Sequence, residues 1–149
     1  MNMDAFHKNI RKTIDECSYD FFVVRPNKNI KCTCVTHATK QADPDCKLCL
    51  GTGYKIIIKK FNGSSNEELK GANSGGKSAY VSRTYFVYKN NLREDDLIVD
   101  DDEIFYVFRV QDMKALKGFK THQEAFAVRR NNDHTVSLKN FKELIKPYL

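Results

Sequence analysis

Four of the five cysteines in this 149-residue chain lie close together in two pairs. Cys32 and Cys34 are separated by one residue, and Cys46 and Cys49 by two. Two cysteine pairs at such spacings are typical of a tetrahedral zinc site. Four thiolates fill every ligand position and leave none for water or substrate, so the ion they hold is structural and not catalytic. We therefore predict a single structural zinc in each chain, bound by these four cysteines.

The sequence leaves alternatives to this ligand set open. His37 follows Cys34 at a ligand spacing, so five candidate side chains compete for four positions. A set that includes His37 is one alternative, and a segment that binds no metal is the other. The remaining cysteine, Cys17, is expected to be a small buried apolar residue without a reactive role.

Residues around the second cysteine pair suit a tight turn. Gly51, two positions after Cys49, can adopt a positive φ at no steric cost. That conformation lets backbone N–H groups point at the thiolate sulfurs and stabilise the ligands. The Asp-Pro-Asp sequence at 43–45, just before Cys46, favours a turn that brings the second pair round to the first.

The formal net charge of +6 lies in the first part of the chain. Residues 1–60 carry 11 Lys/Arg against 6 Asp/Glu, and residues 61–149 carry 14 against 13. Four bound thiolates and the zinc ion together lower the charge of residues 1–60 from +5 to about +3. We interpret Lys31, Lys47 and Lys55 as offsetting the negative charge of the loaded site, with phosphate binding as the alternative.

Apolar periodicity predicts a helix at each end of the chain and strands between them. The first helix is expected over residues 3–17. The second has Ser137 as its N-cap and stops before Pro147. The strands are expected at 19–25, 54–61, 80–88, 97–99, 103–110 and 125–130. We predict a single domain over residues 1–149 of mainly β (α+β) class, a small β-barrel or sandwich with N- and C-terminal helices. Residues 32–53 form a four-cysteine zinc-knuckle excursion between two of its strands.

Residues 62–78 are predicted to form a mobile loop. They contain four glycines, four serines and one large apolar residue, Leu69. Such a segment buries too little apolar surface to offset the entropy lost on ordering. Loops of this length within a domain are often functional, and contact with a neighbouring subunit is one role for it.

Seven acidic residues lie within residues 94–103. Asp100, Asp101 and Asp102 separate two predicted strands and suit a tight hairpin tip. The run lacks the spacing and the glycine of an EF-hand, so a solvated turn is expected and a calcium site is the alternative.

Sequence signals for catalysis are absent. The chain has no P-loop, dinucleotide-binding fingerprint, Gly-x-Ser-x-Gly motif or His-Glu-x-x-His motif, and its four histidines are scattered. We therefore expect that the protein is not an enzyme.

Membrane and secretion signals are absent as well. No run approaches the roughly 18 apolar residues of a membrane span. The first residues lack the apolar core of a signal peptide. We expect no membrane partner, and a protein made in the cytosol and used or assembled there.

The Cys-x-x-Cys-x-Gly-x-Gly pattern at 46–53 resembles the cysteine repeat of J-domain chaperones. That family carries several such repeats and a His-Pro-Asp triplet, whereas this chain has one repeat and no triplet. The likeness is therefore limited to the zinc knuckle.

A longer part of the chain resembles small virion proteins of tailed bacteriophages. The likeness rests on the Cys-x-Cys pair at 32–34, the Cys-x-x-Cys-x-Gly-x-Gly-Tyr segment at 46–54, the glycine-rich stretch after it and the β-rich second half. Residues 92–110, with a short strand, an acidic turn and a longer strand, are similar to the β-barrel core of head-closure (stopper) and related neck proteins.

The resemblance implies a structural virion protein, a ring-forming head–tail connector. In that family a β-barrel subunit forms a ring below the portal, joins head to tail and can gate DNA exit through a mobile loop, for which residues 62–78 are the candidate. It implies a homo-oligomeric ring, portal or adaptor and tail components as partners, DNA passing through the lumen, and assembly into virions in the host cytoplasm. A tail or baseplate position is an alternative within the same class.

A zinc-ribbon module that binds nucleic acid or regulates transcription is the alternative from another class. The basic first part of the chain favours it, and aromatic residues such as Tyr19, Phe21, Phe22 and Tyr54 could stack on bases.

Overall fold

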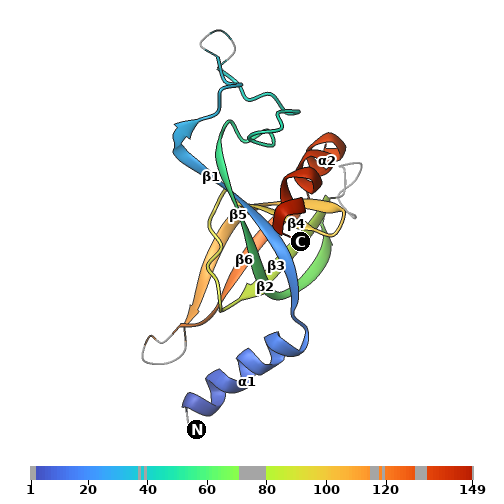
Figure 1. Cartoon of the computed structure of the whole chain (residues 1–149). Coiled ribbons are helices and arrows are strands. Elements are labelled where there is room, and N and C mark those ends of the chain that lie inside the picture. Colours follow the sequence, from blue (N-terminus) through green and yellow to red (C-terminus); the bar gives the residue numbers. More distant parts are fainter. Residues whose placement is uncertain are drawn as a thin grey trace.

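The protein is mainly β, with a helix near each end of the chain (Figure 1). The computed structural model describes residues 3–36, 38, 40–70, 80–114, 118, 120–129 and 134–148. In chain order the elements are α1 (Met3–Glu16), β1 (Tyr19–Lys31), β2 (Tyr54–Lys70), β3 (Tyr80–Val87), β4 (Leu97–Asp100), β5 (Glu103–Lys114), β6 (Lys120–Arg129), α2 (His134–Ile145) and the 3₁₀ turn η2 (Lys146–Tyr148). The predicted fold class is confirmed.

The six strands form one antiparallel sheet that closes on itself in the order β1-β2-β3-β6-β5-β4. β1 pairs with β2 along one edge and, through residues 22–24, with β4 along the other. β5 joins β4 to β6, and β6 pairs with β3. The pairing therefore gives the barrel rather than the sandwich.

Side chains that alternate along the strands fill the barrel. On β1, Phe21 and Val23 belong to the interior cluster, whereas Val24 belongs to a second cluster outside it and Phe22 packs against that second cluster. The ring centroids of Phe21 and Tyr85 lie 5.1 Å apart. The interior cluster comprises Phe21, Val23, Phe61, Tyr85, Val87, Leu92, Ile98, Phe105, Val107, Ala125 and Ala127. This barrel is small enough for side chains to fill it.

α2 covers part of the outer surface of the barrel. Phe141 packs against Phe22 of β1, with ring centroids 5.6 Å apart. α2 ends at Ile145, before Pro147 as predicted, but begins at His134, so the prediction of Ser137 as its N-cap was wrong. The second cluster comprises Val24, Leu50, Leu97, Val99, Ile104, Phe141 and Ile145.

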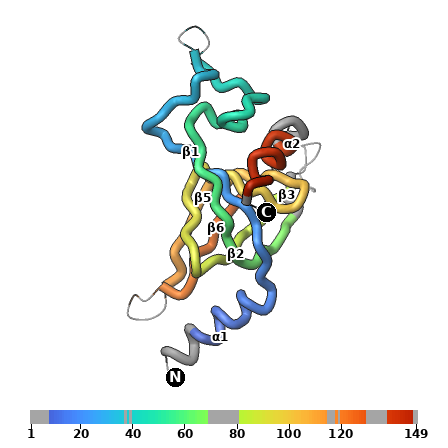
Figure 2. The backbone as a smooth tube through the Cα atoms, in the orientation of Figure 1, coloured from blue at the N-terminus to red at the C-terminus, as the bar shows by residue number. Residues whose placement is uncertain are grey.

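β1 continues past Pro26, where the sequence predicted its end. Because β4 pairs with residues 22–24 alone, Pro26 lies where β1 has lost one neighbour, and proline is tolerated at such strand edges. Residues 25–31 of β1 and 54–57 of β2 form a two-stranded ribbon, which we call the arm. Figure 2 shows the arm extending beyond the barrel, with the cysteine segment (residues 32–53) at its end.

β2 also runs further than predicted, through Lys70, so residues 62–70 are strand and the prediction of a loop there was wrong. β2 pairs with β1 as far as Gly63 and with β3 from Ser64 onward. A Cβ atom at Gly63 would lie 2.6 Å from the Phe86 carbonyl oxygen. Gly63 therefore permits a close backbone approach where β2 changes neighbours. The rest of the predicted loop, 71–78, lies outside the described residues.

The acidic run includes the predicted hairpin tip. Asp100 pairs with Glu103, and Asp101 between them has a φ of 51°. Asp96 and Asp100, however, are buried, so the expected solvated turn is wrong for these two residues. They hold cationic side chains: Asp96 binds Arg25, and Asp100 accepts a hydrogen bond of 2.6 Å from Arg83.

α1 lies at the opposite end of the barrel from the cysteine segment (Figure 1). The side chain of Arg11 donates from Nε to the Thr121 carbonyl oxygen at 3.1 Å, and Tyr88 donates to Asp15. Ile14 is buried against the barrel. These contacts with the barrel stabilise α1, which is too short to be stable as an isolated helix.

Candidate metal centre

The arm brings the two ends of the cysteine segment together. The Cys32 amide donates a hydrogen bond of 2.9 Å to the Gly53 carbonyl oxygen, directly beyond the last arm pair, Lys31 and Tyr54. The two ends of the segment are therefore joined at the tip of the arm.

The four predicted ligand side chains converge. The sulfur atoms of Cys32, Cys34, Cys46 and Cys49 all lie within 4.8 Å of one another. Sγ of Cys32 is 3.7 Å from that of Cys46, and Sγ of Cys34 is 3.6 Å from that of Cys49. A tetrahedral ion with Zn–S bonds of about 2.3 Å separates its sulfurs by about 3.8 Å, whereas a disulfide requires about 2.05 Å. The cluster thus fits a metal ion and contains no disulfide.

Within the described part of the chain, this is the one group of three or more potential ligands that could hold a metal. The acidic run contributes no such group there, which leaves the calcium alternative without support. His37 lies outside the described residues, so the alternative ligand set stays a prediction. Cys17 is exposed, and the expectation that it would be buried was wrong.

The turn after Cys49 has the predicted backbone conformation. Gly51 has a φ of 83°, as does Gly53, and both backbone N–H groups bond to the sulfur of Cys49. The Leu50 amide donates to the Cys46 carbonyl oxygen at 3.0 Å, which closes the turn between the two ligands. Hydrogen bonds of this kind orient and stabilise thiolate ligands.

The turn before Cys46 also forms. The Asp45 amide donates to Oδ1 of Asp43 at 3.0 Å, and the Cys46 amide donates to the Asp43 carbonyl oxygen at 3.1 Å. The Asp43 side chain thus caps a local turn, as the Asp-Pro-Asp sequence predicted.

The surroundings of the sulfur atoms lower the pKa of one cysteine thiol and raise the pKa of two others. The backbone N–H of Cys34 lowers the pKa of Cys32 to about 7. The backbone N–H of Asp43 lowers the pKa of Cys34, but burial and the neighbouring sulfurs outweigh it and raise that pKa to about 12. Burial raises the pKa of Cys49 against the effect of the Gly53 and Gly51 amides. A metal ion must therefore displace protons that this cluster holds at neutral pH.

The cysteine segment is attached to the barrel as well as to the arm. Leu50 is 1 % exposed and lies in the second cluster, outside the barrel, with Phe141 and Ile145 of α2. Nδ2 of Asn140, also on α2, donates to the Asp45 carbonyl oxygen at 3.2 Å. The sequence analysis predicted neither the burial of Leu50 nor the hydrogen bond from Asn140. The sequence signal for the burial was Leu50 itself, a large apolar residue immediately after the last cysteine.

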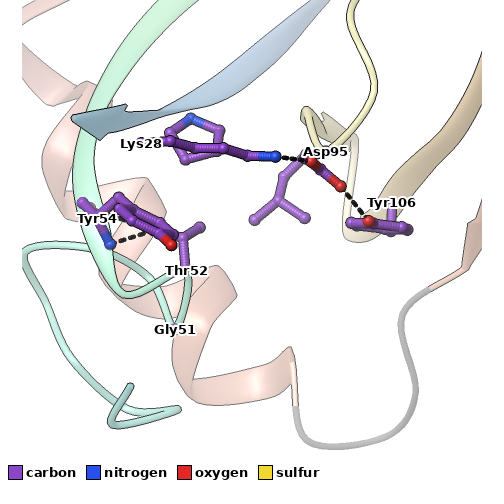
Figure 3. Close-up of a pocket in the computed structure, with 8 residues that line it drawn as sticks. Lys28, Gly51, Thr52, Tyr54, Asp95 and Tyr106 are labelled. Carbon is purple, nitrogen blue, oxygen red and sulfur yellow. Dashed lines mark hydrogen bonds and ion pairs between the residues drawn. The ribbon is translucent and has the colours of Figure 1, made fainter. Parts of the chain in front are cut away.

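A cleft of about 490 Å³ lies between the cysteine segment and the barrel. Figure 3 shows Lys28 reaching to Asp95, which also accepts a hydrogen bond from Tyr106, while Tyr54 lines the other side. The bond to Asp95 raises the pKa of Tyr106 to about 12, so its hydroxyl remains a donor. The described residues of the lining include no thiol and no histidine. Its polar groups are the amine of Lys28, the carboxylate of Asp95 and the hydroxyls of Thr52, Tyr54 and Tyr106.

An apolar groove of about 590 Å³ runs between the arm, the cysteine segment and α2. Ile30, Leu48 and Ile57 line it and are exposed, and Leu144 of α2 contributes to it. Tyr106 and Phe108 on β5 are also exposed. The described surface therefore carries exposed large apolar side chains in this groove and on β5, and contiguous apolar patches often mark protein contacts.

The chain matches no protein-family model, and it has no significant sequence match among curated proteins. Among the described helices, none is long and apolar enough to span a membrane.

Proposed function

We propose that this protein is a structural virion component, a ring-forming head–tail connector of the head-closure or neck type in a tailed bacteriophage. The resemblance of the cysteine segment and the β-rich half to these proteins supports the proposal. The closed barrel with terminal helices is the architecture that the resemblance implies. Portal or adaptor and tail components are the proposed partners, and DNA passes through the lumen of the ring.

The observation that carries the proposal is the distribution of exposed apolar side chains. Ile30, Leu48 and Ile57 line the groove beside the arm, and Phe108 lies on β5 of the barrel. The groove and Phe108, which does not line it, are unlike features of one chain and suit a heterologous contact, in which one surface of a subunit binds a different surface of the next. Heterologous contacts that close produce rings.

The metal in this proposal is zinc, held by Cys32, Cys34, Cys46 and Cys49. Sulfur distances of 3.6 and 3.7 Å and backbone N–H donors to the sulfurs support a closed thiolate site. When bound, zinc supplies a structural cross-link between two turns and no open coordination position. The proposed role of the metal is therefore structural.

Light scattering after size-exclusion chromatography tests the ring, with negative-stain electron microscopy as the second readout. We expect a closed oligomer whose mass falls toward that of the monomer in Leu48→Asp, because the substitution puts a charge into the apolar groove. Lys59→Ser on β2 is the control, since Lys59 is exposed and does not line the groove. A wild-type protein that stays monomeric at all concentrations would contradict the proposal.

The nucleic-acid alternative is favoured by the exposed lysines Lys31, Lys47 and Lys55 on and near the arm. A salt titration of DNA binding separates the two functions, because several phosphate contacts give a steep dependence of affinity on salt. Tight, strongly salt-dependent binding by a monomer would favour the alternative. Weak binding by a ring-forming protein supports the connector.

A further inference from the structure

Leu50 connects the metal centre to the core of the protein. It follows the ligand Cys49 directly, and its side chain is 1 % exposed within the cluster that contains Phe141 and Ile145. Leu48, two positions earlier in the same turn, is 65 % exposed. Of the two leucines in this turn, one is therefore a core residue and the other a surface residue.

The backbone at Leu50 is held in a conformation that leucine rarely adopts. Its φ is 53°, in the left-handed region, which disfavours residues with a Cβ atom. The turn that holds it is closed by the Leu50 amide and the Cys46 carbonyl oxygen, at 3.0 Å, and is bounded by the ligands Cys46 and Cys49. A metal ion that binds both ligands fixes this turn and so directs the Leu50 side chain into the second cluster.

α2 contacts the cysteine segment at a second point. Asn140 is buried, and its side chain donates to the carbonyl oxygen of Asp45, the residue before the ligand Cys46. α2 thus binds the segment beside Cys46 through this hydrogen bond, and Leu50, beside Cys49, lies in the same apolar cluster as Phe141 and Ile145 of α2. Lys139, the neighbour of Asn140, is exposed.

We propose that metal binding and the packing of α2 on the barrel are one coupled equilibrium, transmitted through Leu50 and Asn140. The inference rests on the zinc site proposed above and not on the ring. Metal binding stabilises the turn that seats Leu50 under α2. By thermodynamic reciprocity, the packed α2 strengthens metal binding by the same factor. Loss of the metal releases α2 and uncovers the barrel surface beneath it.

The first test measures metal affinity with Co²⁺, whose thiolate complexes absorb in the visible range, followed by competition with Zn²⁺. Leu50→Ala is expected to weaken binding by about tenfold or more, within the usual range of coupling between sites. Asn140→Ala is expected to weaken it several-fold. Leu48→Ala and Lys139→Ala are the matched controls and should leave the affinity within about twofold of wild type.

The second test measures hydrogen exchange of α2 in the whole protein before and after metal removal by a chelator. Removal is expected to raise exchange at residues 138–145 far more than in β5 and β6. Unchanged exchange in α2 would overturn the proposal, as would wild-type Co²⁺ affinity in folded Leu50→Ala. If Leu50→Ala fails to fold, Asn140→Ala and the exchange experiment decide. Neither readout requires a ring to form, so the connector and the coupling can fail separately.

Discussion

Arg25 and Asp96 form a bidentate ion pair where the arm leaves the barrel. Nε of Arg25 lies 3.0 Å from Oδ1 of Asp96, and Nη2 lies 2.9 Å from Oδ2. The two side chains are 11 % and 1 % exposed. The guanidinium also donates to the Asn91 carbonyl oxygen at 2.8 Å, so most of its polar atoms are satisfied away from water. The pair thereby holds the base of the arm to the loop before β4.

Asp96→Ala should lower the free energy of unfolding by about 3–5 kcal/mol, because it leaves the buried Arg25 without its partner. Urea denaturation of the zinc-loaded protein measures the change. Asp102→Ala is the control: it removes an ion pair with Lys142 in which the aspartate side chain is 79 % exposed. The control should be close to wild type, since exposed pairs contribute little. Equal effects of the two substitutions would show that the Arg25–Asp96 pair does not anchor the arm.

Gly63→Ala is expected to destabilise the protein strongly. The added Cβ would lie 2.6 Å from the Phe86 carbonyl oxygen and 2.7 Å from Cγ1 of Val87, so β2 and β3 would have to separate. Overpacking of this kind costs about 1–3 kcal/mol or more, which thermal unfolding can measure. Gly118→Ala is the comparison, because its Cβ would meet nothing within 4 Å and only its φ of 77° is unfavourable. A smaller loss at Gly63 than at Gly118 would contradict the close approach.

The metal ligands could be predicted because their information is local. Cys46 and Cys49 lie within one turn, and Gly51 follows at the spacing that such a turn requires, so sequence distance stands in for spatial distance. Leu50 and Phe141 lie in one apolar cluster although they are 91 positions apart, and no local sequence pattern indicates this. The burial of Leu50 follows only from where α2 packs in the folded protein.

The strands were predicted correctly where apolar residues alternate. The predictions failed where backbone pairing or distant ion pairs determine the structure. Residues 62–70 are polar and small, so composition predicted a loop, but backbone pairing with β3 makes them strand. Asp96 and Asp100 are acidic residues in an acidic run, and composition predicted solvent exposure. Their burial depends on Arg25 and Arg83, which are distant in sequence.

Tyr19 gives the stability a dependence on alkaline pH. Burial and the hydrogen bond to Asp100 raise its pKa from 10.0 to about 12, so the folded protein keeps a proton that the unfolded chain loses. Stability contributed by this group is present below about pH 10 and is lost as the pH rises toward about 12. Urea unfolding across that range should show the decline, and Tyr19→Phe should flatten it. Burial also raises the pKa of Tyr85, so some slope should remain in the variant. Equal slopes in both proteins would exclude Tyr19 as the cause.

Metal analysis of protein purified without chelator should find about one zinc per chain, the capacity of a single four-thiolate site. Cys49→Ser should lose the metal and expose the cysteine segment to proteolysis, because Cys49 is a buried member of the sulfur cluster. Cys17→Ser is the matched control, since Cys17 is exposed and lies outside the cluster. Zinc binding displaces thiol protons, so affinity should fall as the pH is lowered. Metal-free wild-type protein with a fully protected cysteine segment would refute the zinc site.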